Sequence, residues 1–232
     1  MSTSVARRQS RKGGEKRDPL ATRRALLEAG AHLFPRGGFD GVSIEELAER
    51  AGVNKALVSY HFGGKRGLYV AGLEAAFADM ADRLRAIDEE GVDAREGLHR
   101  FFEAFEAVTR ERPDFPTLFL REVLSGGIDP AVVPHLLEIM AVTRGLAARG
   151  HREGAFRRVD PVLFHFGLVG ALGFFFATQG ARRRARAAGQ IPFEMPTPQA
   201  FVRYLEEMTL RGLAPGPSPT RTKNKKRKGA RS

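Results

Sequence analysis

The side chains that could perform metal or acid–base chemistry are scattered along this 232-residue chain. The six histidines are His32, His61, His99, His135, His151 and His165. None is followed by another at the i+3 or i+4 spacing that places two metal ligands on one helix face. The chain has no cysteine, no G-x-S-x-G motif and no phosphate-binding glycine-rich loop, and its carboxylates are dispersed. We therefore expect a protein that is not an enzyme and that carries no metal or cofactor.

The basic side chains point instead to an anionic partner. The formal net charge is +11, but residues 1–24 contribute +6 and residues 214–232 contribute +7, so the rest of the chain is at −2. Residues 1–18 and 214–232 are polar or rich in proline and lack helical periodicity, and we expect both to be disordered basic arms. These arms could supply sequence-independent attraction to nucleic acid.

One internal stretch, AGVNKALVSYHFGGK at residues 51–65, has a pattern that could read DNA. It follows a short predicted helix at about 44–50 and contains all of a second at about 55–62, with Gly52 in the turn between them. An S-x-x-E capping box starts the first helix at Ser43. Two short helices joined by a turn of this length are typical of a helix-turn-helix, whose second helix enters the DNA major groove.

A helical wheel separates the two faces of the second helix. At about 100° per residue, Val58 and Phe62 share one face and should pack on the preceding helices, while Tyr60 lies opposite. The outward and flanking positions are small, aromatic or hydroxylic more than charged: Lys55, Ala56, Leu57, Ser59, Tyr60 and His61. Such side chains contact base edges, thymine methyl groups or phosphates.

The elements that position this stretch are predicted to be helical throughout. Apolar residues recur at helical spacing, broken by glycine and proline, and no good strand pattern occurs. About nine helices are expected, at 20–35, 44–50, 55–62, 65–90, 94–112, 115–125, 131–152, 160–186 and 197–212. The longest apolar run, residues 162–178, is shorter than the roughly 20 residues of a membrane span and is interrupted by His165, so we expect a buried helix.

A longer set of positions matches a known family. These elements are Thr22-Arg23, Ala29, Leu33-Phe34, Gly38-Phe39, Ile44, Leu47-Ala48, Ala51-Gly52-Val53, Tyr60, Phe62, Lys65 and Leu68. Through them residues 22–69 resemble the N-terminal domain of TetR-family transcriptional regulators. The resemblance implies an all-α protein with a three-helix helix-turn-helix DNA-binding domain at 19–72. It also implies a larger helical ligand-binding and dimerisation domain at 73–213.

The resemblance also implies roles for individual residues. Ser43 matches the hydroxyl residue that grips phosphate at the start of the second helix, and Lys65 matches the lysine at the start of the fourth. The recognition-helix surface corresponds to Lys55, Ala56, Leu57, Ser59, Tyr60 and His61. Four positions depart from the family: Ser59 stands where many members have tyrosine, Leu57 where a polar residue is frequent, Gly64 where a Ser or Thr cap is usual, and Pro35 falls in the last turn of the first helix.

The last two helices of family members form a bundle between two subunits, which implies a homodimer here. The corresponding apolar and small residues are Phe164, Gly167, Gly170, Gly173, Phe174, Phe201, Leu205 and Met208. Ordinary core packing within one chain is the alternative interpretation of these positions.

A pocket for a small effector would be lined from the fifth to the eighth helix. The candidates are Phe101, Phe105, Phe119, Val123, Met140, His165 and Phe166. Such a lining implies a largely apolar or aromatic ligand. The alternative is a packed core, with His165 bonded to a backbone carbonyl. Residues 112–129 are weakly similar to the subgroup of pyrimidine-responsive regulators, from which no pyrimidine ligand is inferred.

The leading hypothesis is a ligand-responsive transcriptional repressor in the bacterial cytoplasm, associated with the nucleoid and not with a membrane. It would bind a near-palindromic double-stranded DNA operator as a homodimer and be released by a small effector. Two other hypotheses remain at this point: a nonspecific architectural DNA-binding protein that acts through its basic arms, and a helical interaction or enzyme scaffold.

Overall fold

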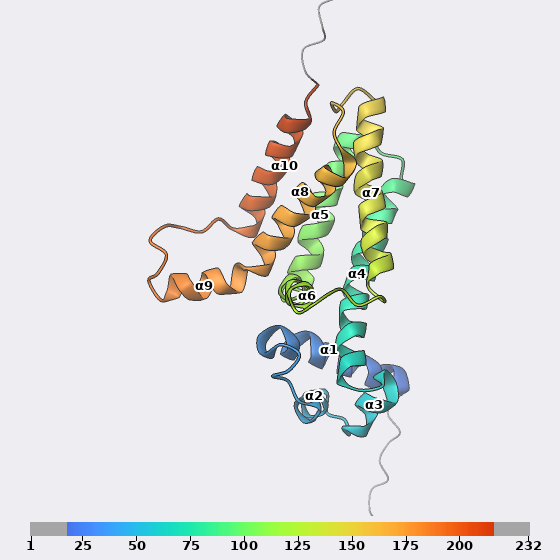
Figure 1. Cartoon of the computed structure of the whole chain (residues 1–232), viewed down its shortest axis with the longest axis vertical. Coiled ribbons are helices and arrows are strands. Elements are labelled where there is room, and N and C mark those ends of the chain that lie inside the picture. The colour runs from blue at the N-terminus through green and yellow to red at the C-terminus, as the bar shows by residue number, and fades with distance from the viewer. Residues whose placement is uncertain (1–17, 216–232) are drawn as a thin grey trace, which may run out of the picture.

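A computed structural model describes residues 18–215, which consist of helices joined by turns and loops (Figure 1). The helices are α1 Pro19–Gly37, α2 Ile44–Ala51, α3 Ala56–Phe62, α4 Lys65–Glu89, α5 Ala94–Glu111, α6 Phe115–Leu124, α7 Val133–Arg152, α8 Pro161–Ala177, α9 Gln179–Ala187 and α10 Pro198–Leu213. The all-α prediction is confirmed. The two predicted arms lie outside the described residues, except for Asp18, Ala214 and Pro215.

One predicted helix, 160–186, is in fact two. The chain bends by 41° between α8 and α9, at Thr178, whose hydroxyl donates a hydrogen bond to the Phe174 carbonyl at 2.7 Å. The side of α8 that faces the body is buried, whereas none of the described residues of α9 is buried. The helix therefore turns where its apolar sequence gives way to arginine, and α9 projects from the body (Figure 1).

Helices α1 to α3 pack around the first turns of α4 at one end of the molecule (Figure 1). The centre of this unit is apolar and closed to solvent, and it takes one or more side chains from each helix: Leu26, Phe34, Leu47, Val58 and Leu68. Burying each such side chain stabilises the unit by about 1.5–3 kcal/mol. The short α2 and α3 are thus stabilised mainly by packing, since helices of this length are marginal alone.

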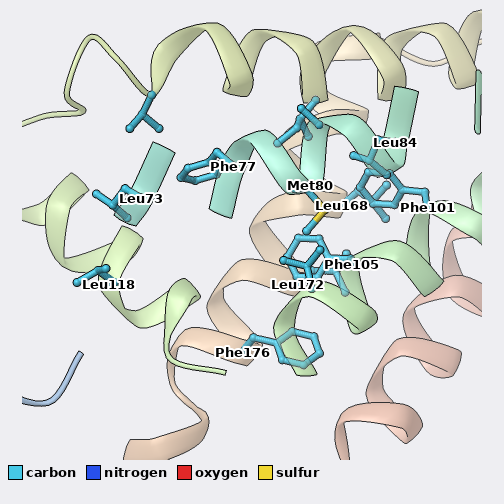
Figure 2. Packing of buried hydrophobic residues seen from close by; sticks show 14 of the residues in the cluster. Leu73, Phe77, Met80, Leu84, Phe101, Phe105, Leu118, Leu168, Leu172 and Phe176 are labelled. Carbon is cyan, nitrogen blue, oxygen red and sulfur yellow. The ribbon is translucent and has the colours of Figure 1, made fainter. Parts of the chain in front are cut away.

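The larger body contains the rest of α4 with α5 to α8 and α10. Its core is lined from four helices, as Figure 2 shows, by Leu73, Phe77, Met80, Leu84, Phe101, Phe105, Leu118, Leu168, Leu172 and Phe176. Because α4 is one continuous helix from Lys65 to Glu89, the predicted domain boundary at 72/73 falls inside it. Any tilt of α4 within the body would therefore move the N-terminal unit.

Over residues 18–215 no single helix is both long and apolar enough to cross a bilayer. Helices α8 and α9 meet that test only as a pair, across their 41° bend.

Candidate nucleic-acid interface

Local hydrogen bonds and one left-handed glycine set the start of α2, its end and the start of α3. The Ser43 hydroxyl accepts from the Glu46 backbone N–H at 3.1 Å, and the Glu46 carboxylate accepts from the Ser43 N–H at 2.7 Å, which completes the predicted capping box. These bonds lower the pKa of Glu46. At the other end, Gly52 adopts a left-handed φ of 65°, which side chains with a Cβ rarely adopt. Asn54 then accepts from the Ala56 N–H at 2.9 Å and starts α3.

The recognition helix α3 has one buried and one exposed face, as the helical wheel predicts. Val58 is fully buried, and Tyr60 on the opposite side is 78% exposed. Ala56 and Ser59 are also exposed, whereas Leu57 is half-buried and packs against the apolar core. Leu57 is therefore as much a packing residue as a surface one, and this accounts for an apolar side chain at that position.

The far end of α3 lies directly against α4. A Cβ atom on Gly67 would stand 1.7 Å from the Phe62 carbonyl oxygen, so only glycine allows the two helices to approach this closely. On the other side of Phe62, the Arg23 guanidinium lies 5.1 Å from the ring centroid. The end of α3 is thereby held between α1 and α4.

The two predicted lysines differ in their surroundings. The Lys55 ammonium lies 3.0 Å from the Glu45 carboxylate, and both side chains are exposed. Exposed pairs of this kind are weak and a phosphate can replace the carboxylate. The Lys65 ammonium donates to the Val42 carbonyl at 2.9 Å and lies 4.4 Å from the Phe39 ring centroid. Lys65 therefore also holds the loop before α2, and its ammonium has further N–H donors.

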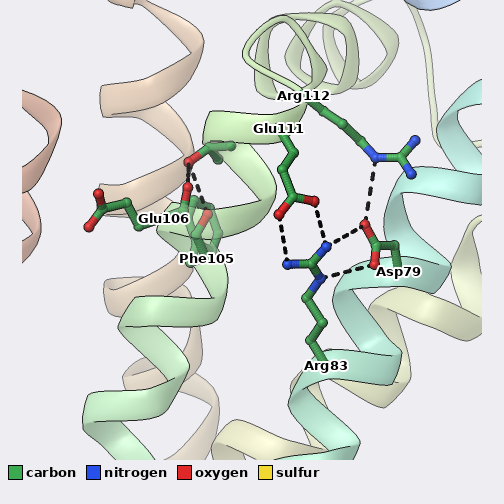
Figure 3. A network of polar contacts seen from close by, with 7 residues as sticks. Asp79, Arg83, Phe105, Glu106, Glu111 and Arg112 are labelled. Carbon is green, nitrogen blue, oxygen red and sulfur yellow. Dashed lines mark hydrogen bonds and ion pairs between the residues drawn. The ribbon is translucent and has the colours of Figure 1, made fainter. Parts of the chain in front are cut away.

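Next to Lys65, an ion-pair cluster joins the N-terminal unit to the body. The Arg66 guanidinium lies 2.7 Å from Glu122 of α6 and 3.2 Å from Asp129 of the following loop. These carboxylates raise the pKa of Arg66. Burial, helped by the Glu122 charge, raises the pKa of the neighbouring Tyr69 to about 12. A second cluster, drawn in Figure 3, places Arg83 between Asp79 and Glu111 and so joins α4 to the end of α5.

The residues predicted to line an effector pocket are not all gathered in one place. Phe101 and Phe105 are buried in the body core, with ring centroids 6.5 Å apart. Phe166 is 62% exposed, so that prediction is corrected: it lies on the outer face of α8. Phe119 and Met140 are half-buried, and Val123 is exposed.

His165 is buried, and its polar partner differs from the backbone carbonyl considered above. Its Nδ1 lies 2.8 Å from the hydroxyl oxygen of Thr143 on α7. Burial lowers the pKa of His165. Thr143 of α7 and His165 of α8 thus form a buried polar pair in apolar surroundings.

The predicted dimer residues form two groups. Gly167, Gly170, Phe174 and Met208 are exposed, and a Cβ on Gly167, Gly170 or Gly173 would meet open space. The others pack within the chain: the Phe201 ring stacks on Phe175 at 3.9 Å, and Phe164 and Leu205 lie against the core.

Further large apolar residues are exposed on the same two helices. Leu163 and Tyr204 were not among the predicted dimer residues, and Phe166 was predicted to line a pocket instead. On α8 the exposed positions recur at 163, 166, 167, 170 and 174, a helical stripe that the spacing alone could have revealed.

An exposed reading helix, carried by a three-helix unit on a larger all-helical body, defines a helix-turn-helix transcriptional regulator. Residues 26–71 match the family described as "Bacterial regulatory proteins, tetR family". The chain is 31% identical over 151 residues to the HTH-type transcriptional regulator RutR of Escherichia coli K12, covering 64% of this chain and 71% of RutR. It is 23% identical over 213 residues to the HTH-type transcriptional repressor NicS of Pseudomonas putida, covering 88% of this chain and 99% of NicS.

Solved structures share the fold. The TetR family transcriptional regulator PfmR of Thermus thermophilus is 24% identical, with a TM-score of 0.65 over 82% of this chain and 99% of PfmR. FadR of Bacillus subtilis, solved in complex with stearoyl-CoA, is 13% identical, with a TM-score of 0.68 over 82% of this chain and 98% of FadR. The chain belongs to the TetR family of bacterial transcriptional regulators.

Proposed function

We propose that this regulator binds a near-palindromic DNA operator as a homodimer, represses transcription, and is released by a small, largely apolar effector. The observation that carries the proposal is the outer face of α3, where Tyr60 is 78% exposed opposite a fully buried Val58. Tyrosine combines an apolar ring with a hydroxyl that can donate and accept hydrogen bonds, so at the surface of a fixed helix it is suited to base or phosphate contacts.

Within the proposed interface two groups of residues have different tasks. Ala56, Ser59, Tyr60 and His61 would contact base edges and adjacent phosphates, and Leu57 would contribute from the edge of the helix. Lys55, Ser43 and Lys65 would set the register on the phosphate backbone. The Lys65 ammonium is already fixed at the Val42 carbonyl and keeps further N–H donors for a phosphate. The Ser43 hydroxyl donates to the Glu46 carboxylate at 2.8 Å and would turn its proton from that carboxylate to the phosphate.

The dimer is supported by the apolar stripe on α8 and α10. Exposed Leu163, Phe166 and Phe174 flank glycines at which the helix backbone is open to close approach. An isologous contact through this face would bury the stripe against its own copy and place two α3 helices on one side of the assembly. Half-sites one helical turn apart, about 34 Å, would then be read in successive major grooves.

The effector is proposed to enter the body among the aromatic residues of α5 to α8, close to the Thr143–His165 pair. The complex of FadR with stearoyl-CoA is an example of a related fold with a ligand that carries a long apolar chain. Because α4 runs unbroken from this body to the N-terminal unit, a ligand that changes the packing of α4 would change the separation of the two reading helices. Effector and operator must then weaken each other's binding by the same factor.

Selection from randomised DNA with the purified full chain, followed by titration of the selected site, tests the proposal. Replacing Tyr60 by alanine should weaken the selected site at least about tenfold, because each lost base contact costs about 1–3 kcal/mol and the dimer makes it twice. The matched control is Phe193→Ala, an exposed aromatic residue in the loop after α9. Equal affinity for selected and random DNA, or wild-type affinity in Tyr60→Ala, would contradict the proposal.

A further inference from the structure

A cavity of about 400 Å³ lies where the N-terminal unit meets the body. It is bounded by α1, the C-terminal end of α2, α4 and the connection between α5 and α6. Small residues line it from α1 and α4, namely Gly30, Ala31, Gly72 and Ala76, and a Cβ on Gly72 would meet open space. None of the residues predicted to line the effector pocket lines this cavity. Its volume is within the range of small-molecule sites.

The floor of the cavity is apolar, with Leu27, Phe34, Leu68, Phe115 and Leu118 among its lining. Its rim is charged, and most of those charges already have partners. Asp114 lies 3.5 Å from Arg36, and Arg112 lies 3.6 Å from Asp79. Glu111 is held by Arg83 at 2.6 Å, as Figure 3 shows. The charges within these pairs offset one another, so the pairs present little net charge to a ligand.

Arg50, at the end of α2, is the one positively charged residue of the rim that is not in these ion pairs. Among the side chains described in residues 18–87 and 89–215, its guanidinium has no hydrogen-bond or ion-pair partner. His32 lies within its electrostatic reach, and burial together with Arg36 and Arg50 lowers the pKa of His32, so the imidazole is neutral at pH 7. Glu28, on the same side of α1, is the one carboxylate of the rim outside these pairs. The Arg50 end therefore offers a cation and a neutral imidazole above an apolar floor.

We propose that this cavity binds a small organic monocarboxylate with an aromatic or short aliphatic body. The carboxylate pairs with Arg50 beside His32, and the apolar body lies on the floor between α1 and α4. Charge-assisted hydrogen bonds from a guanidinium to a carboxylate are among the stronger polar contacts in proteins. The site is separate from the proposed effector pocket in the body core, and its occupant touches the N-terminal unit and the body at once.

The test uses 4-fluorobenzoate and the full-length protein, with binding followed by the broadening of the ¹⁹F resonance. We expect saturable binding to the wild type. Gly72→Leu should abolish it, because a Cβ at Gly72 meets open space and the longer side chain would occupy the cavity. Gly145→Leu on α7 is the matched control, since its Cβ also meets open space and it does not line the cavity. That variant should bind as the wild type does.

A second variant tests the recognition of charge. Arg50→Gln, at an exposed position, should weaken 4-fluorobenzoate at least about tenfold, the scale of a lost hydrogen bond to a charged group. Circular dichroism of each variant checks that the fold is retained. Three results would each overturn the proposal. The first is undiminished binding of 4-fluorobenzoate to Gly72→Leu, and the second is tighter binding of 4-fluorobenzylamine than of 4-fluorobenzoate to the wild type. The third is no binding of 4-fluorobenzoate to the wild type at about 10 mM, a concentration ten times a Kd of about 1 mM. None of these readouts depends on DNA.

Discussion

The ion pair between Arg66 and Glu122 should contribute measurably to the joint between the reading unit and the body. Two Arg66–Glu122 contacts of 2.7 and 3.3 Å form a forked pair, and the Glu122 side chain is only 8% exposed. At a charge separation of roughly 4 Å and an effective dielectric constant of about 20, the attraction is about 4 kcal/mol. Because the Arg66 side chain is 51% exposed, solvent screening reduces this, and we expect a coupling of about 2 kcal/mol.

A double-mutant cycle measures that coupling. The variants are Arg66→Met, which keeps most of the aliphatic stem, Glu122→Gln, which keeps the shape, and the two together. The free energy of unfolding of each comes from urea denaturation followed by circular dichroism, and the coupling is the departure from additivity. The double variant should lose less stability than the sum of the two single variants, because each single variant leaves one partner without its counter-charge.

The matched control is the pair Arg85–Asp82, whose N–O distance of 2.6 Å is nearly the same but whose side chains are 52% and 66% exposed. Its cycle should show no resolvable coupling. If the Arg66–Glu122 coupling is also below about 0.5 kcal/mol, the range of exposed pairs, then burial of Glu122 does not strengthen the pair and the reasoning is refuted.

Three further outcomes are expected. Phe174→Glu should convert a dimer into a monomer in analytical ultracentrifugation, whereas Leu137→Glu, an exposed position on α7, should not; an unchanged dimer would exclude this face. Because burial lowers the pKa of His165 below its ordinary 6.5, the unfolded chain takes up a proton first as pH falls through 6.5. The contribution of His165 to the unfolding free energy should therefore be level above that pH and decline below it, so the loss of stability between pH 8 and pH 5 should be smaller in His165→Gln than in the wild type. Removing residues 1–17 and 216–232, with net charges of +5 and +7, should flatten the salt dependence of DNA binding and keep base preference; loss of the preferred site would contradict this.

The bounds of most helices could be predicted from the sequence because their signals are local. The capping box at Ser43, the left-handed Gly52 and the side-chain cap from Asn54 each act over two to four residues, so their positions follow from the letters alone. The inward Val58 and outward Tyr60 follow from the helical period. The sequence does not reveal the break at Thr178, since no proline occurs between Pro161 and Pro192 and only the change from buried to exposed surroundings separates the two halves.

The sequence by itself determined the all-helical class, the helix-turn-helix and the family resemblance, because these rest on spacing within short segments. Tertiary structure decided what each apolar position faces. Helical periodicity marks an apolar side chain in the same way whether it enters a core, as Phe101 does, or lies on an open face, as Phe166 does. It also decided that Lys65 holds the Val42 carbonyl and that small residues of α1 and α4 enclose a cavity beside Arg50. Such contacts join segments that are distant in the sequence, and only the packing of the whole chain brings them together.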